Sequence, residues 1–219
     1  QYSHIYGFDH MGIWVFSGAM KTTLEISDQL LLKAKRLAKK QGVTLRSLTE
    51  EGLRKAIQYF EQALELDPEY ALAYSGLADA YMLLAINFGL LEEYLAKAGE
   101  AATRAVALDD SLAEGHASLG FFRYLTYDWP DAEIELRQAL AIDPGYAIAH
   151  QWYAHLLMTT GRIDESLAET RRALQLDPLS SIINAAAEVY GSIVTKILVQ
   201  VYVVIKLTNH LAIYAMKAP

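Results

Sequence analysis

Most of this chain carries apolar residues three or four positions apart, in runs that polar turn residues separate. This spacing predicts amphipathic helices, and the short links between the runs predict that successive helices pack side by side in antiparallel pairs. Gly161 supplies a turn between the last two runs. We therefore expect an all-α fold of helical hairpins, with its clearest helices at 50–66, 70–84, 112–124, 146–160 and 163–176.

One five-residue motif recurs along these runs and sets their period. It reads Leu64-Glu-Leu-Asp-Pro68 at its first occurrence, and its later copies end at Asp110, Pro144 and Pro178, so the spacings are 42, 34 and 34 residues. Proline lacks an amide hydrogen and pushes the preceding residue out of the α region, so the motif ends a helix. An alanine that allows two helices to approach closely precedes each copy, at Ala63, Ala105, Ala139 and Ala173.

The pattern resembles tetratricopeptide (TPR) repeats, whose unit is 34 residues, over about 44–190. Residues 73–81 and 116–120 match the first helix of a unit, and Ala132, Leu136, Ala139 and Pro144 match the second. Three features depart from the family pattern: eight extra residues around 85–96, Asp110 in place of proline, and Thr170 in place of a large apolar residue. The resemblance implies a TPR-type helical-hairpin solenoid of three full units, flanked by half units at 50–66 and 181–190.

In such a solenoid the first helices line a concave groove. The resemblance therefore implies a non-catalytic scaffold for protein–protein interaction, which binds a peptide or a partner helix there. His116 and His150 take positions of a large packing ring. The expected groove residues are Leu72, Ser75, Asp79, Met82, Phe121, Tyr124, Gln151, His155 and Met158.

Residues 20–57 form a candidate head with a different pattern. Thr22, Leu24 and Ile26 alternate with polar neighbours and predict a short strand. Ser27 and Asp28 then cap a helix to about residue 40, a turn follows at 41–43, and Thr44 caps a second helix. Lysine and arginine exceed aspartate and glutamate by five between residues 21 and 57, whereas the rest of the chain has an excess of twelve acidic residues.

This small strand-helix-helix head resembles the ribbon-helix-helix heads of bacterial antitoxins and repressors. The resemblance implies a homodimer whose two-stranded ribbon binds duplex DNA in the major groove. The alternative is a cap on the repeat stack, and residues 49–57 fit both families at once, which also suggests a fusion of two proteins. The residues that would contact DNA are Lys21, Thr23, Glu25, Thr44 and Arg46.

Both ends of the chain differ from the repeats. Residues 1–19 precede Met20 and are interpreted as a leader or an added segment, and residues 58–190 form the repeat array. Residues 191–219 are an apolar tail of uncertain role. Its apolar run at 189–207 fits a cap, a dimer contact or a membrane segment, although Lys196 within it disfavours membrane insertion.

Composition narrows the possible functions of the 219 residues. The absence of cysteine excludes disulfides and cysteine-ligated metals and suits the cytoplasm, and the net charge of −7 argues against nucleic acid as a partner of the whole surface. The sequence contains no glycine-rich phosphate loop, nucleophile elbow or His-Glu-x-x-His motif. His4, Asp9 and His10 are too few for a metal site. We therefore expect no enzyme activity, cofactor or metal.

Overall fold

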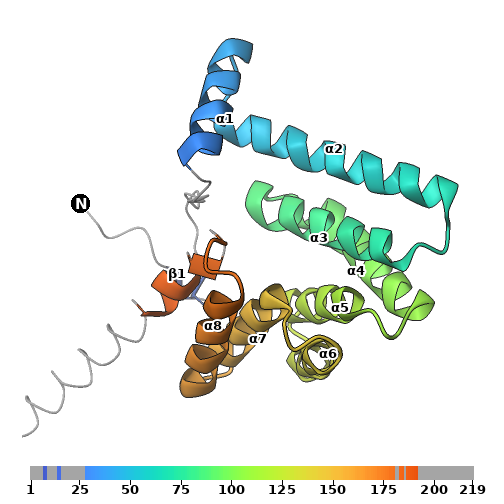
Figure 1. Cartoon of the computed structure of the whole chain (residues 1–219), viewed down its shortest axis with the longest axis vertical. Helices are drawn as coiled ribbons and strands as arrows, with labels where there is room; N and C mark the ends of the chain where they lie inside the picture. The colour runs from blue at the N-terminus through green and yellow to red at the C-terminus, as the bar shows by residue number, and fades with distance from the viewer. Residues whose placement is uncertain (1–6, 9–13, 16–27, 181–182, 185, 192–219) are drawn as a thin grey trace, which may run out of the picture.

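The computed structural model of the chain describes residues 7–8, 14–15, 28–180, 183–184 and 186–191, and these residues form a helical solenoid (Figure 1). Two-residue strands β1 (Gly7–Phe8) and β2 (Trp14–Val15) make an antiparallel pair outside it. The other elements are α1 (Asp28–Gln41), α2 (Leu45–Leu66), α3 (Ala71–Phe88), α4 (Leu91–Leu108), α5 (Ala113–Leu125), α6 (Trp129–Ile142), α7 (Ala147–Thr159) and α8 (Ile163–Leu176). The predicted all-helical, TPR-like solenoid is confirmed.

The helices form two layers. Within each unit, the first helix packs on the second, as α3 packs on α4, α5 on α6 and α7 on α8. The first helices also pack on one another, α3 on α5 and α5 on α7, whereas the described parts of α4, α6 and α8 make no such contacts among themselves. The first helices therefore lie closer together and line the inner side of the curved stack, as solenoid geometry requires.

The aspartate of the repeated motif ends each second helix by two sets of hydrogen bonds. The backbone N–H of Asp67, Asp109, Asp143 and Asp177 donates to the carbonyl of the alanine four residues earlier. The Asp109 carboxylate also accepts from the backbone N–H of Ser111, at 3.0 Å, and Asp67 and Asp143 make the equivalent bond. The turn therefore forms without proline, which explains why Asp110 does not disturb the repeat.

The eight extra residues of the first unit lengthen its helices. Helices α3 and α4 have 18 residues each, whereas α5 has 13 and α6 has 14. Gly89, at a φ of 74°, adopts the left-handed conformation that ends α3, and α4 begins two residues later. Because the insertion is absorbed inside a hairpin, Ala105 still occupies its fully buried position.

Small side chains allow neighbouring helices to pack closely. Ala105, Ala139 and Ala173 are completely buried, as their spacing predicts. The third departure from the family pattern, Thr170, is also buried, and its hydroxyl donates to the carbonyl of Ser166 at 2.7 Å. Because this bond satisfies the hydroxyl, threonine fits where an apolar residue is usual.

The described part of the candidate head consists of two helices joined at Gly42, whose φ is 69°. Thr44 caps α2 as predicted, by accepting from the backbone N–H of Ser47 at 3.0 Å. However, the second helix of the head and the repeat helix predicted at 50–66 are one continuous helix, so the predicted boundary after Ile57 lies inside α2. Ile57 is buried against α3 and α4, so α2 belongs to the solenoid. The described residues give the ribbon-helix-helix resemblance no support, and the predicted strand lies outside them.

Helix α3 is long and apolar enough to cross a membrane by length and composition alone. Half of it is buried inside the solenoid, so packing in the core accounts for its length and its apolar composition. The apolar tail from residue 192 onward lies outside the described residues. Its interpretation as a cap, a dimer contact or a membrane segment stays a prediction.

Candidate functional site on the inner face

The nine predicted groove residues divide by exposure. Asp79, Phe121, Tyr124, His155 and Met158 are partly buried, and Leu72 is 42% exposed, so these six lie within reach of a partner. Ser75, Met82 and Gln151 are only 2%, 1% and 5% exposed. The structure corrects the prediction for these three, because neighbouring helices cover them.

Five rings form an aromatic cluster on three successive inner elements: Phe121, Tyr124, Trp152, His155 and Tyr190. Phe121 of α5 stacks on Trp152 of α7, with ring centroids 4.6 Å apart, and Phe121 and Tyr124 stack at 5.9 Å. Tyr190, in the helical residues after α8, meets His155 edge to face at 5.4 Å. The sequence analysis did not select Trp152 or Tyr190 among the groove residues.

His155 is a neutral hydrogen-bond acceptor within this cluster. Burial lowers the pKa of His155 to about 4, and a hydrogen bond to the Gln151 carbonyl opposes this effect only in part. Its Nδ1 lies 3.0 Å from that carbonyl oxygen and must be the donor. In a neutral imidazole, Nε2 then carries the lone pair. The ring therefore offers an acceptor and no positive charge at neutral pH.

A carboxyl group lies beside the cluster, in a network of two serines. The Ser75 and Ser118 hydroxyls are 2.9 Å apart, and Ser118 donates to Asp79 Oδ1 at 2.7 Å. Burial raises the pKa of Asp79 to about 7, although the Ser118 hydrogen bond favours the charged form. Burial also raises the pKa of Tyr146, and the charges of Asp79, Glu114 and Asp143 add to that shift. Glu114 lies one helical turn before Ser118 in α5, so it is on the same side of α5 as the contact with Asp79.

Positive charge is nearly absent from the inner helices. Among the residues that make up α3, α5 and α7, the only lysine or arginine is Arg123, and it donates to Asp128 at 2.8 Å. Two nearby cations, Arg54 and Lys97, instead approach the ring of Tyr94 on α4. The inner face therefore combines aromatic rings and carboxyl groups without a matching cation.

Two histidines outside this face connect the two helices of a hairpin, His116 in the α5–α6 pair and His150 in the α7–α8 pair. His116 Nδ1 lies 2.6 Å from Glu135 of the second helix, and its Nε2 lies 2.9 Å from the Asp110 carbonyl. His150 repeats this arrangement with Glu169 and the Pro144 carbonyl. Burial lowers the pKa of His150, but its bonds to these two acceptors outweigh burial, so the net shift is upward. The expected packing role of the two rings thus includes a hydrogen bond to a glutamate of the second helix.

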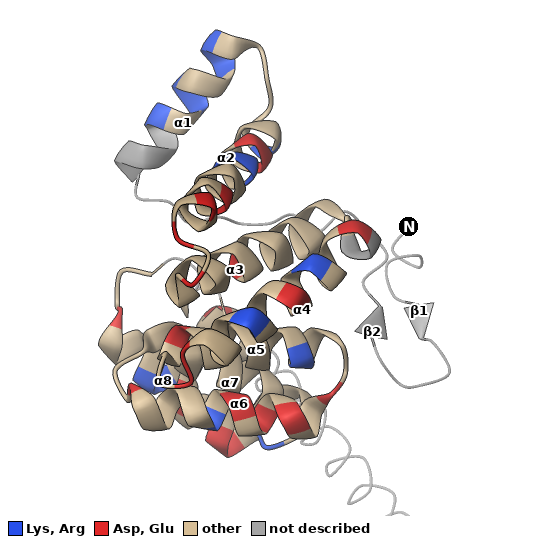
Figure 2. Ribbon diagram, turned by 90° about the vertical axis from the view of Figure 1, so that its right-hand side faces the viewer, with Lys and Arg blue, Asp and Glu red and all other residues tan. Residues whose placement is uncertain are grey.

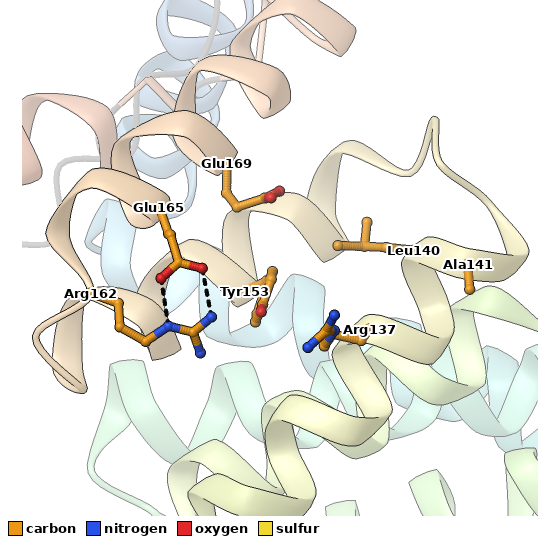
Figure 3. Close-up of a pocket in the computed structure, with 7 residues that line it drawn as sticks. All are labelled: Arg137, Leu140, Ala141, Tyr153, Arg162, Glu165 and Glu169. Atoms are coloured by element: carbon orange, nitrogen blue, oxygen red, sulfur yellow. Dashed lines mark hydrogen bonds and ion pairs between the residues drawn. The ribbon is translucent and has the colours of Figure 1, made fainter.

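A cavity of about 490 Å³ opens on the outer side, between α6 and α8 above Tyr153 of α7 (Figure 3). Arg162 forms a two-pronged pair with Glu165, at 2.8 and 2.6 Å, and also donates to Glu133 at 2.7 Å. Tyr153 donates to the same Glu133 oxygen at 2.8 Å. The sequence analysis missed this network, which brings residues of three helices together. Arg137 adds a second cation 3.8 Å from Glu133, so each charge of the network has a partner, which fits a structural role between repeats.

The described residues give no support to the candidate DNA-binding and metal-binding sites. Thr44 caps α2, and the Arg46 guanidinium lies over the Phe88 ring at 5.1 Å, so both take part in the fold. Lys21, Thr23 and Glu25 lie outside the described residues, as do His4, Asp9 and His10. Across the part of the chain that the structure describes, no three histidine, cysteine, aspartate or glutamate residues gather as a metal site would need.

Comparison with known proteins places tetratricopeptide repeats in the chain at residues 127–188 and 53–70. The chain is 26% identical over 136 residues to the transcriptional regulator HilA of Salmonella typhimurium (strain LT2), which is 61% of this chain and 24% of HilA. HilA of Salmonella typhi matches equally, so the chain spans about a quarter of the length of these relatives.

Two solved structures resemble the solenoid. TTC0263, a thermophilic TPR protein of Thermus thermophilus, is 24% identical with a TM-score of 0.54, over 74% of this chain and 89% of that one. The first TPR of Spaghetti (RPAP3), bound to the HSP90 peptide SRMEEVD, is 14% identical with a TM-score of 0.47, over 59% and 96% of the two chains. The likeness to TTC0263 supports the TPR-like fold.

Proposed function

We propose that this chain is a non-catalytic scaffold that binds a peptide or a partner helix on the inner face of its solenoid. The observation that carries the proposal is the aromatic cluster, whose rings span successive inner helices. Phe121, Tyr124 and Trp152 remain partly exposed there. Large aromatic side chains supply much of the binding energy at protein interfaces, and a solenoid presents them along an extended concave surface.

The cluster could instead serve only to join successive repeats. Phe121 stacks on Trp152 across the α5–α7 contact, so these rings contribute to the stability of the stack. Replacing these rings by alanine distinguishes the two roles. If the rings only pack, the substitution lowers the free energy of unfolding alone, and if they also bind a partner, it lowers the affinity for that partner as well. Tyr124 can distinguish the two roles. Its hydroxyl lies 3.1 Å from that of Thr159 at an exposed position, so this end of the ring faces solvent and a partner can reach it.

A peptide selection tests this function. A random library of displayed 12-residue peptides is selected on the full chain, and the affinities of selected peptides are measured by fluorescence anisotropy. Replacing Phe121 and Tyr124 by alanine should weaken binding about tenfold or more, since interface anchors contribute more than 1 kcal/mol. Tyr59→Ala is the matched control, because this ring is 69% exposed on α2. Equal affinities for the double variant and the control, with both folded by circular dichroism, would refute the proposal.

The alternative of DNA binding by a homodimer through residues 20–57 stays a prediction. The described observation nearest to it is the row of lysine and arginine residues along α1 (Figure 2). The relatives named as transcriptional regulators are about four times longer than the matched region, so regulation would be a property of the longer protein. A cytoplasmic location, which the lack of cysteine suits, is likewise proposed.

A further inference from the structure

We propose that the segment bound on the inner face presents a lysine or arginine beside an apolar anchor, with the cation at Asp79 and Glu114 and the anchor on the aromatic cluster. This inference rests on the proposed function and gives the partner a chemical class. It follows from three features of the inner face: the arrangement of its residues, the kind of polar atom they offer, and the sign of their charge.

The arrangement places acid and rings along one line. Asp79, Phe121 and His155 hold equivalent positions in α3, α5 and α7, since they lie 42 and 34 residues apart, the spacings of the repeated motif. The Ser118 hydroxyl connects the two regions, because it binds Asp79 while belonging to the same helix as Phe121. A segment that crosses the inner helices in order therefore passes a carboxyl group, then a stacked pair of rings, then an imidazole.

Several polar atoms along this line are acceptors, beside the donors of Tyr124 and Trp152. The carboxyl groups of Asp79 and Glu114 accept hydrogen bonds when ionised, and the Nε2 atom of neutral His155 also accepts. Lysine and arginine side chains carry only donors, so they complement this set. A segment rich in aspartate or glutamate would instead place acceptor against acceptor and charge against like charge.

The unmatched charge favours the same partner. Asp79 interacts with Ser118, while Arg123 of α5 pairs with Asp128 and Lys97 of α4 lies over the rings of Tyr81 and Tyr94. Aromatic faces also attract cations. Among the described residues, the rings that have a cation over them are Phe88, Tyr81 and Tyr94. The partly exposed rings of the aromatic cluster, Phe121, Tyr124 and Trp152, are therefore open to a cation that a partner supplies.

The 12-residue library, selected on the full chain, tests the inference directly. We expect selected peptides to be enriched in lysine or arginine next to an apolar residue, and replacing that cation by glutamine should lower affinity at least tenfold. Glu114→Gln and Asp79→Asn, measured separately, should each lower affinity for the basic peptide about three- to tenfold. Glu100→Gln, which removes an exposed carboxylate of α4, should leave it unchanged.

The outcomes separate this inference from the proposed function. Neutral or acidic peptides that lose affinity in the Phe121→Ala, Tyr124→Ala variant would overturn the preference for a cation and leave inner-face binding intact. The same holds if Glu114→Gln and Asp79→Asn bind the basic peptide as tightly as the Glu100→Gln control. If selection yields no peptide that depends on Phe121 and Tyr124, both the inference and the proposed function are overturned.

Discussion

At the scale of single residues, the environment of Asp79 conflicts with the usual charge of a carboxyl group. It lies in the middle of the apolar helix α3, and burial raises its pKa from 3.8 to about 7. A carboxyl group with a raised pKa in the folded state stabilises the fold fully below the pKa of the unfolded chain. That contribution falls as pH rises from about 4 through 7.

Replacing Asp79 by asparagine should therefore remove a pH dependence. From pH 5 to pH 8, the wild type should lose roughly 2–3 kcal/mol of unfolding free energy relative to the Asp79→Asn variant, because a shift of one pKa unit corresponds to about 1.4 kcal/mol. Urea titrations at both pH values measure this difference. Glu100→Gln should keep the pH dependence of the wild type. Parallel curves for wild type and Asp79→Asn would contradict the assignment.

At the scale of elements, close approach between helices depends on a few glycines. A Cβ atom added at Gly120 of α5 would lie 2.7 Å from Leu136 Cγ and 3.1 Å from the Leu136 backbone nitrogen of α6. Gly52 of α2 is also helical, but nothing lies within 4 Å of the position its Cβ would take. The two positions therefore separate the effect of packing from that of helix propensity.

Alanine should have opposite effects at these two glycines. Gly120→Ala should destabilise the protein by about 1–3 kcal/mol, because overpacking against α6 outweighs the gain in helix propensity. Gly52→Ala should stabilise by up to about 1 kcal/mol, since only propensity changes. Chemical denaturation followed by circular dichroism measures both. A stabilised Gly120→Ala variant would show that α5 and α6 do not approach this closely.

At the scale of the whole molecule, the solenoid has no contacts between distant units among its described helices. Each described helix packs on its near neighbours, and α1 packs on α2 alone. Figure 1 shows α1 standing at one end of the stack, away from α3 to α8. Ala38 is the one buried side chain among those described in α1. Stability in such a stack is close to a sum of units and interfaces, so it varies along the chain.

Hydrogen exchange should reveal this gradient. Amides of α1 should exchange fastest, and those of α3 and α5 slowest, because both of these helices pack on neighbours on either side. Helix α3 also supplies more than half of the buried residues in the cluster that it forms with α2, α4 and α5. Mass spectrometry of the full chain at several exchange times measures the order. The matched comparison is α1 against α6, since both have 14 residues. Equal protection of α1 and α6 would mean that the molecule opens as one unit.

Local chemistry allowed much of the fold to be predicted from sequence. Helix periods depend on residues three or four positions apart, and Asp-Pro turns on adjacent residues, so α8 lies where its apolar run predicts, at 163–176. The buried alanines follow from the same period. Two helices were predicted where α2 lies, one capped by Thr44 and one at 50–66, because residues 49–57 fit two families. The structure joins them in one helix that packs on α3.

The sequence by itself therefore determined the repeat period, the helix ends at the repeated aspartate turns, the inner position of the first helices and the acidic charge of the chain. The tertiary structure alone decided which inner residues remain accessible. Ser75 is closed because it meets Ser118, 43 positions away, and Tyr190 reaches the ring of His155 from beyond α8. Burial and charge pairing depend on the neighbouring helix, whose distance and side-chain size are not encoded in the local pattern.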